Sequence, residues 1–198
     1  MGIHENPQKG IGDQQLKIGI INVTGYSGIE LARLLHRHPE AELAAVTGRS
    51  FAGKKLGDVF PHLSSIDLTI TEELGESVDL VISALPQTAS AERLIPVIEQ
   101  GIPAIDISAD FRLKDVDEYQ TWYKTSHPCP QFLGDAVFGL PELNREEIAG
   151  AKLIANPGCY STAVILALAP ALKTGIIEPD VVADCKSGVS GAGRSPSL

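Results

Sequence analysis

Apolar and polar positions follow two alternating patterns along the chain. Short apolar runs rich in β-branched residues indicate strands buried on both faces, whereas leucines three or four residues apart indicate helices. The predicted strands cover residues 16–23, 42–47, 78–85, 103–108, 152–155 and 181–185. The predicted helices cover residues 30–38, 88–100, 116–125 and 159–172. The last helix is apolar enough to be buried, although Pro170 should end or bend it early.

This alternation predicts an α/β fold with a Rossmann-type, doubly wound parallel sheet. We assign residues 16–156 to this dinucleotide-binding domain and residues 157–198 to the beginning of a second domain. Residues 1–15 are polar and lack the apolar core of a signal peptide, so we expect a flexible tail. The pattern ends on a strand followed by the glycine-rich loop 187–196, which is typical of a truncated chain.

Composition and charge narrow the classes of partner. The 198 residues carry 16 basic and 25 acidic side chains, for a net charge of −9. Such a surface repels nucleic acid and anionic membranes, so we expect small molecules and proteins as partners. No apolar run approaches the roughly 20 residues that span a bilayer. Cys129, Cys159 and Cys185 fit neither a zinc motif nor a disulfide framework, which predicts no metal and a reducing cytoplasm.

A glycine turn joins the first predicted strand to the first predicted helix. A dinucleotide fingerprint has glycines at the tight turn, at the pyrophosphate and where helix meets strand. Gly25 and Gly28 fill the second and third places, and Asn22 occupies the first. Asparagine tolerates left-handed backbone angles, so the tight turn can form with asparagine in place of glycine. We expect N–H groups at the helix start to bind a pyrophosphate, against the alternative of a plain strand-to-helix turn.

The end of the second predicted strand bears on which dinucleotide binds. An NAD enzyme places an acid about 20 residues after the turn, where it binds the ribose hydroxyls. This chain has Arg49 and Ser50 in that region, and these side chains suit a 2′-phosphate. The pair predicts NADP(H) as the cofactor. The alternative is an ordinary solvated arginine.

Cys159 lies between a strand end and a helix start. A helix N-terminus favours the thiolate, and its N–H groups can stabilise an oxyanion. Such a thiolate can attack an acyl phosphate, expel phosphate and hold the acyl group as a thioester for hydride delivery. An isolated cysteine is more often a small buried apolar residue, which is our interpretation of Cys129 and Cys185. The sequence assigns none of the five histidines as general acid or base.

Seven motifs stand in a fixed order along the chain. They are TGYSG with EL (24–31), GRS with AG (48–53), ALP (84–86), DISADFR (106–112), GLPEL (139–143), NPGCY (156–160) and SGVSGAGR (187–194). Together, at these distances, they resemble the N-acetyl-gamma-glutamyl-phosphate reductase family of arginine biosynthesis, in the semialdehyde dehydrogenase superfamily. The similarity runs from Leu16 to about Pro196.

The resemblance implies that the whole protein reduces N-acetyl-L-glutamyl 5-phosphate to N-acetyl-L-glutamate 5-semialdehyde with NADPH, and that Cys159 forms the thioester. It also implies a homo-oligomer, a catalytic histidine beyond Leu198, and that residues 157–198 begin an α+β catalytic and dimerisation domain. The residues that it places around NADP(H) are Thr24, Gly25, Tyr26, Ser27, Gly28, Arg49, Ser50, Leu85, Pro86, Ser187 and Gly188. Its candidates for binding the acyl phosphate substrate are Ser108, Arg112, Asn156 and Arg194.

Alternatives to this interpretation stay open. Arg112 and Arg194 can each hold a carboxylate or phosphate at two points, or form a structural ion pair, with Asp110 in the case of Arg112. Aspartate-semialdehyde dehydrogenase and the reductase of the lysine amino-adipate route share the thiol, hydride and phosphate chemistry. The turn at Tyr26 and the segment around Cys159 favour the arginine-pathway family. A non-catalytic NADP-binding module is the alternative from another class, since the family's acid/base partner is missing here.

Overall fold

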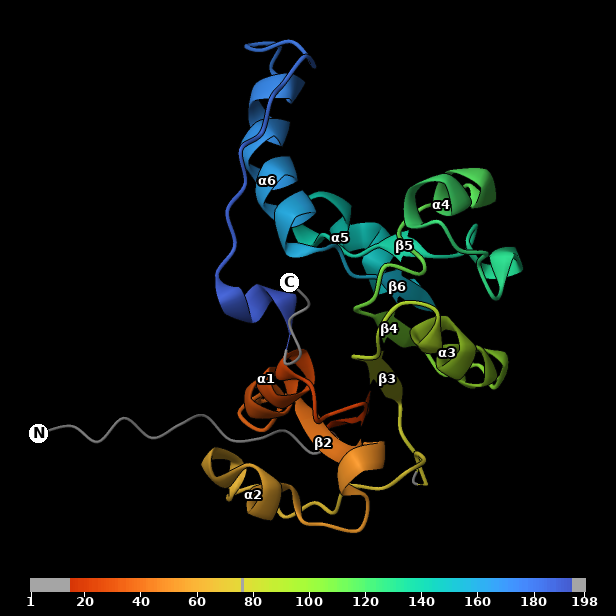
Figure 1. The fold of residues 1–198 in the computed structure, drawn as a ribbon, viewed down its shortest axis with the longest axis vertical. Helices are drawn as coiled ribbons and strands as arrows, with labels where there is room; N and C mark the ends of the chain where they lie inside the picture. The colour runs from red at the N-terminus through yellow and green to blue at the C-terminus, as the bar shows by residue number, and fades with distance from the viewer. Residues whose placement is uncertain (1–14, 76, 194–198) are drawn as a thin grey trace, which may run out of the picture.

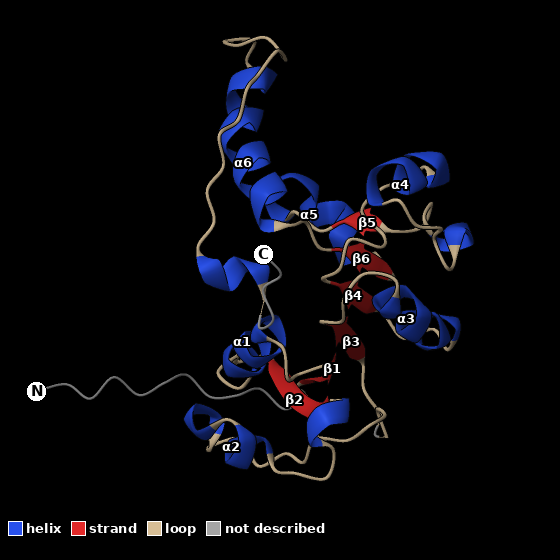
Figure 2. Ribbon diagram, viewed as in Figure 1, coloured by secondary structure: helices blue, strands red, loops and turns tan. Residues whose placement is uncertain are grey.

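The computed structural model describes residues 15–75 and 77–193. A six-stranded sheet lies at its centre, in the order β2-β1-β3-β4-β6-β5 (Figures 1 and 2). Every neighbouring pair in this sheet is parallel. The strands are β1 Leu16–Ile21, β2 Ala41–Val46, β3 Leu80–Ser83, β4 Ala104–Asp106, β5 Val137–Phe138 and β6 Leu153–Ala155.

Helices connect the strands and cover both faces of the sheet. The α-helices are α1 Tyr26–Leu35, α2 Leu56–Val59, α3 Ala89–Glu99, α4 Val116–Tyr123, α5 Pro141–Ala149 and α6 Cys159–Lys173. The 3₁₀ helices are η1 Arg49–Phe51, η2 Pro61–Leu63, η3 Pro130–Phe132 and η4 Val189–Ala192. Figure 1 shows α1 and α3 on opposite faces. The chain thus winds outward from β1 and β3 in two directions, which confirms the predicted doubly wound α/β fold.

Successive residues of the central strand enter two separate cores. Ile20 packs in a cluster with Ala32 of α1, whereas Ile21 packs in a cluster with Leu94 of α3. Side chains alternate between the faces of a strand, so a sheet covered on both faces needs apolar residues at consecutive positions. This requirement explains why the strands stand out in the sequence as continuous apolar runs.

The prediction for the last fifty residues is partly wrong. Helix α6 begins at Cys159, but it buries none of its residues against the described chain, and Figure 1 shows it extending away from the sheet. It also continues past Pro170 to Lys173, because a proline in the last turn removes only one backbone bond. Residues 181–185 form no strand within the described chain and are exposed, since no sheet edge lies beside them to supply hydrogen bonds.

Several short elements are absent from the sequence-based prediction. Residues 51–65, where no element was predicted, contain α2 and η2, and residues 126–141, likewise without a predicted element, contain η3 and the edge strand β5. Helix α5 was not predicted either, and α1 starts at Tyr26, four residues before the predicted start at Glu30. These segments are too short, or too poor in leucine, to display a helical or strand period.

Candidate functional site

A cleft of about 370 Å³ opens at the carboxyl ends of β1 and β3. The winding of the sheet reverses between these two strands, and doubly wound proteins bind their ligands at such a switch point. Thr24, Arg49, Ser50 and Leu85 of the predicted cofactor residues line it, and Pro86 is exposed beside Leu85. The complete lining is Ile21, Asn22, Thr24, Thr47, Gly48, Arg49, Ser50, Glu72, Leu85, Ala89, Glu92 and Arg93.

The turn after β1 is packed tightly against the start of α1. A Cβ atom on Gly28 would stand 2.5 Å from the carbonyl oxygen of Asn22, so this position requires glycine. Gly28 is thus the glycine at which helix meets strand. Gly25 precedes the helix in an extended conformation, with φ −79° and ψ 165°. The first N–H groups of a helix have no partner within it, so those of the exposed Tyr26 and Ser27 can bind an anion.

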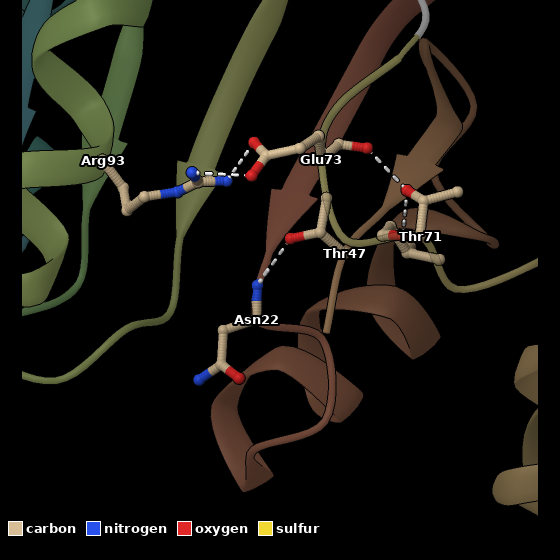
Figure 3. A network of polar contacts seen from close by, with 6 residues as sticks. Asn22, Thr47, Thr71, Glu73 and Arg93 are labelled. Atoms are coloured by element: carbon tan, nitrogen blue, oxygen red, sulfur yellow. Dashed lines mark hydrogen bonds and ion pairs between the residues drawn. The ribbon is translucent and has the colours of Figure 1, made fainter. Parts of the chain in front are cut away.

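Asn22 occupies the place of the first glycine, with φ 65° in the left-handed region. Its Nδ2 donates to the carbonyl oxygen of Ala84 at 2.9 Å, and its Oδ1 accepts from the Thr24 hydroxyl at 3.3 Å. Its backbone N–H donates to Oγ1 of Thr47 at 3.3 Å, as drawn in Figure 3. A glycine could make only the backbone bond. Asn22 therefore joins the ends of β1, β2 and β3 at the switch point.

A distant segment forms part of the cleft wall next to β2. Thr71 pairs with Thr47 in a parallel bridge, and its hydroxyl donates to the carbonyl oxygens of Val46 at 3.3 Å and Glu73 at 2.7 Å. Figure 3 shows this network between β2 and the incoming segment. The pairing brings Glu72 into the lining of the cleft.

Three charged lining residues, Glu72, Glu92 and Arg93, were missed by the sequence-based prediction. Glu92 and Arg93 follow Ala89 at spacings of three and four residues, so one face of α3 presents all three to the cleft. Glu92 and Arg93 could have been predicted from this helical spacing after the loop at Leu85. Glu72 carries no such signal, because only the tertiary bridge at Thr71 brings it to the cleft.

Cys159 is the first residue of α6 and is exposed as a free cysteine. The strand before it, β6, ends at Ala155, so the helix starts from the same carboxyl edge of the sheet as the cleft. Gly158 precedes it in an extended conformation, with φ −71° and ψ 162°. The cysteine does not line the cleft, since β3 and β4 separate β6 from β1. An accessible sulfur at the N-terminus of a 15-residue helix has the setting of a nucleophile.

Arg112 supports the loop that carries this cysteine. Its Nε donates to the carbonyl oxygen of Asn156 at 2.9 Å, and its Nη2 donates to that of Ile107 at 2.7 Å. Its Nη1 lies 3.1 Å from the position of a Cβ on Gly158. The side chain thus joins the loops after β4 and β6. It pairs with carbonyl groups rather than with Asp110, so the ion pair considered from the sequence does not form.

Ser108, a candidate substrate residue, is buried in a polar network. Its hydroxyl donates to Oδ2 of Asp106 at 2.7 Å and accepts the N–H of Asp110 at 3.0 Å. Ser90 of α3 donates to the other oxygen of Asp106 at 2.5 Å. Burial raises the pKa of Asp106, against the lowering effect of these hydrogen bonds. The network fixes α3 against the end of β4.

Asp110 extends this network to the start of α3. Its carboxylate accepts the N–H groups of Thr88 at 2.8 Å and Ala91 at 2.9 Å, and the hydroxyl of Tyr119 at 2.9 Å. Burial is the main reason why the pKa of Tyr119 is raised to about 12. The carboxylate therefore anchors the beginning of α3 to α4, next to the loop that lines the cleft.

The remaining predicted residues lie elsewhere. Ser187 and Gly188 are exposed immediately before η4 and do not line the cleft. Arg194 lies outside the described residues. Cys129 is buried, as expected, whereas the prediction that Cys185 is buried is wrong, because the whole stretch around it is exposed. Across 15–75 and 77–193, no three histidine, cysteine or acidic side chains are grouped to hold a metal ion.

Family models identify this architecture. A model for the NAD binding domain of semialdehyde dehydrogenase matches residues 17–151, more than half of the chain. The chain belongs to the semialdehyde dehydrogenase family. The matched range contains the whole lining of the cleft. A second model, for the dimerisation domain of semialdehyde dehydrogenase, matches residues 159–198 and begins at the exposed cysteine.

Curated relatives within this family share about half of the positions. N-acetyl-gamma-glutamyl-phosphate reductase of Dehalococcoides mccartyi is 57% identical over 93% of this chain and 54% of its own length. The protein of the same name from Thiobacillus denitrificans is 49% identical over 90% of this chain and 54% of its own length. The resemblance inferred from the seven motifs is thus confirmed. The chain spans about half the length of these relatives.

Solved semialdehyde dehydrogenases share the fold. Aspartate semialdehyde dehydrogenase II from Vibrio cholerae matches with a TM-score of 0.61 and 20% identity, over 81% of this chain and 47% of its own. The aspartate semialdehyde dehydrogenase of Candida albicans, solved with NADP, matches with a TM-score of 0.58 and 19% identity, over 80% and 47%. No helix among the described residues is long and apolar enough to cross a membrane.

Proposed function

We propose that this chain supplies the cofactor cleft and the nucleophile of an NADPH-dependent N-acetyl-gamma-glutamyl-phosphate reductase. The observation that carries the proposal is the exposed Cys159 at the start of α6, on the same sheet edge as the cleft. The name of the relatives at 57% and 49% identity supports the choice of substrate. We expect such an enzyme to act in the cytoplasm. We also expect it to form a homo-oligomer, in keeping with the match to the dimerisation domain model.

The residues of the cleft fit a phosphorylated dinucleotide. Gly25 leaves the start of α1 open to a pyrophosphate, and Gly28 lets that helix approach β1 closely. Arg49 and Ser50 lie at the β2 side of the cleft, where they would bind a 2′-phosphate. The other end of the ligand would then point past β3 and β4 toward Cys159. Strands are about 4.8 Å apart, so β6 stands roughly 14 Å from β1 along this edge.

The cysteine provides the covalent step. The Cys159 thiolate attacks the acyl carbon of the acyl phosphate, a C–S bond forms, the bond from carbon to the phosphate oxygen breaks, and phosphate leaves. N–H groups at the start of α6 would stabilise the oxyanion that precedes this loss. NADPH, when bound, supplies the hydride that reduces the thioester to the aldehyde and frees the thiolate. Arg112, which holds the Asn156 carbonyl beside this loop, would keep the sulfur in position.

Acylation of the cysteine tests this proposal. The chain is incubated with N-acetylglutamyl phosphate, and intact and peptide mass spectrometry measure the acyl group on each cysteine. We expect one acyl group on Cys159 and release of one phosphate. Acylation by aspartyl phosphate or by the one-carbon-longer N-acetyl homologue should be at least tenfold slower, because one methylene changes the discrimination between substrates by about tenfold or more. The Cys159→Ser variant should bind NADPH with unchanged affinity and form no thioester.

Two controls sharpen the result. Cys185 is also exposed, so its acylation in the same sample reports non-specific reactivity. Equal labelling of Cys159 and Cys185 would contradict a dedicated nucleophile. Loss of NADPH binding in Cys159→Ser would show that the cysteine has a structural role.

A further inference from the structure

An ion pair links Arg93 in the cleft lining to Glu73 beside the cleft. Arg93 of α3 donates to Glu73 through both terminal nitrogens, with Nη1 2.9 Å from Oε1, and Nη2 bonded to Oε2 (Figure 3). Arg93 lines both the cleft and an adjoining hollow of about 240 Å³, and Glu73 lines the hollow. The pair therefore lies at the border of these two spaces.

The backbone holds Glu73 close to the loop that carries Arg49. Its carbonyl oxygen accepts the Thr71 hydroxyl, and the N–H of Gly48 donates to the Thr71 carbonyl at 2.9 Å. The pKa of Glu73 is lowered chiefly by the hydrogen bond from Arg93, and to a lesser extent by the charges of Arg93 and Arg49. Both guanidinium groups thus act on one carboxylate.

The position of Glu73 bears on which cofactor the cleft prefers. An acid near the end of β2 is the feature by which NAD enzymes bind the ribose hydroxyls, and it repels a 2′-phosphate. The sequence near Arg49 lacks such an acid, but the bridge between Thr47 and Thr71 brings Glu73 to the same region. A cleft that accepts a 2′-phosphate must therefore compensate the charge of this carboxylate.

We propose that Arg93 is a specificity-determining residue, which holds Glu73 in an ion pair and so leaves Arg49 to the 2′-phosphate of NADPH. The inference rests on the proposed function, because it assumes that the dinucleotide binds in this cleft. Without Arg93, Glu73 would turn toward Arg49 and compete with the phosphate for its guanidinium. NADH, which lacks that phosphate, would be affected much less.

Titration of the chain with NADPH and with NADH, followed by cofactor fluorescence, tests this inference. We expect Arg93→Met to lower the preference for NADPH over NADH about tenfold, the effect of one uncompensated charge close to an exposed phosphate. Adding Glu73→Gln to that variant should restore the preference to within about threefold of the wild type, because the competing charge is gone. Both effects should shrink in about 1 M salt, which screens exposed charges.

A matched control is present on α1. Arg33 also forms a two-point pair, with Glu30 through Nε and Nη2, outside the lining of the cleft, so Arg33→Met should leave the preference unchanged. An unchanged preference in Arg93→Met, or no recovery in the double variant, would overturn the role of Arg93. If the wild type still binds NADPH, the proposed cofactor cleft stands in that case. A wild-type chain that binds neither dinucleotide would overturn both this inference and the proposed function.

Discussion

At the scale of single residues, the glycine turn shows how side-chain chemistry can replace a missing glycine. Asn22 adopts the left-handed angle that its residue type allows, and its amide then bonds to Ala84 across the switch point. The angle could be predicted from the sequence, because it is a property of asparagine. The bond could not, because it depends on β3 being the neighbour of β1. Asn22, which departs from the glycine of the fingerprint, therefore contributes a hydrogen bond to the site.

Gly28→Ala tests the close approach of α1 to β1. The new methyl group would stand 2.5 Å from the carbonyl oxygen of Asn22 and 2.7 Å from Cα of Val23, and these backbone atoms cannot rotate away. We therefore expect a loss of about 2–3 kcal/mol in the free energy of unfolding. The N-terminus of α1 should shift with it and weaken NADPH binding. Urea unfolding and fluorescence titration measure the two effects.

Gly134→Ala is the control for that variant. No atom lies within 4 Å of its added Cβ and its φ is not in the left-handed region, so stability should change by less than about 0.5 kcal/mol. Equal stabilities of the two variants would mean that α1 is free to move away from β1.

Arg112 and Ser108 show how many partners residue type alone leaves open. Both side chains suit a phosphate, and both are engaged with the protein itself, Arg112 with two carbonyl groups and Ser108 with Asp106. A guanidinium and a hydroxyl bond equally well to backbone and to ligand. Only the fold decides between these partners, so a motif can locate the site without assigning each of its side chains.

At the scale of elements, the loop between α4 and β5 is organised around a buried histidine. His127 packs edge-on against the rings of Phe111 and Tyr119, and its Nδ1 accepts the N–H of Cys129 at 2.9 Å. Burial lowers the pKa of His127 and raises the pKa of Cys129. Both groups are thus held neutral. The sequence offered no partner for this histidine, because Phe111 and Tyr119 come from other elements.

We expect His127 to make the chain less stable in mild acid. Its native pKa lies below the ordinary value of 6.5, so the unfolded chain takes up a proton at a higher pH than the native chain. The contribution of neutral His127 to the free energy of unfolding is then fully present above pH 6.5. It is lost as the pH falls toward the native pKa, by at most about 1.4 kcal/mol per pH unit. Urea unfolding between about pH 7.5 and 5.5 measures this slope.

His127→Asn is the matched comparison. Its side-chain oxygen can still accept the Cys129 N–H but does not titrate, so the variant should be less stable at neutral pH and show a flatter slope. The neighbouring acid groups Asp106, Asp110 and Tyr119 are the same in both chains, so their contributions cancel. An equally steep slope in the variant would assign the acid sensitivity to another group.

Helix α6 shows the limit of hydrophobic pattern as a guide to burial. Its 15 residues are rich in alanine and leucine, which correctly predicted a helix starting at Cys159. The same composition predicted burial, and there it is wrong: Leu166 and Leu172 are exposed. An apolar helix surface favours contact with another protein surface, but the sequence of the helix does not identify that surface.

At the scale of the whole molecule, the central fold was predictable and the walls of the site were not. The four strands β1, β2, β3 and β4 and the helices α1 and α3 follow from local periodicity, and their alternation imposes the switch point where the cleft opens. Glu72 and Glu73 belong to a segment without periodicity, and they come to lie in and beside the cleft only through the pairing of Thr71 with Thr47. Contacts between segments that are distant in sequence therefore set the charge around Arg49.

The proposed chemistry depends most on the position of the Cys159 sulfur relative to the nicotinamide ring. A crystal structure of the chain with bound NADP⁺ measures the distance from nicotinamide C4 to Cys159 Sγ directly. We expect about 5 Å or less, since hydride transfer to a thioester carbon needs reacting atoms about 3.5 Å apart. A distance above about 10 Å, with the dinucleotide seated on Gly25 and Arg49, would contradict the role of this cysteine, because such a gap leaves no room for near-attack geometry.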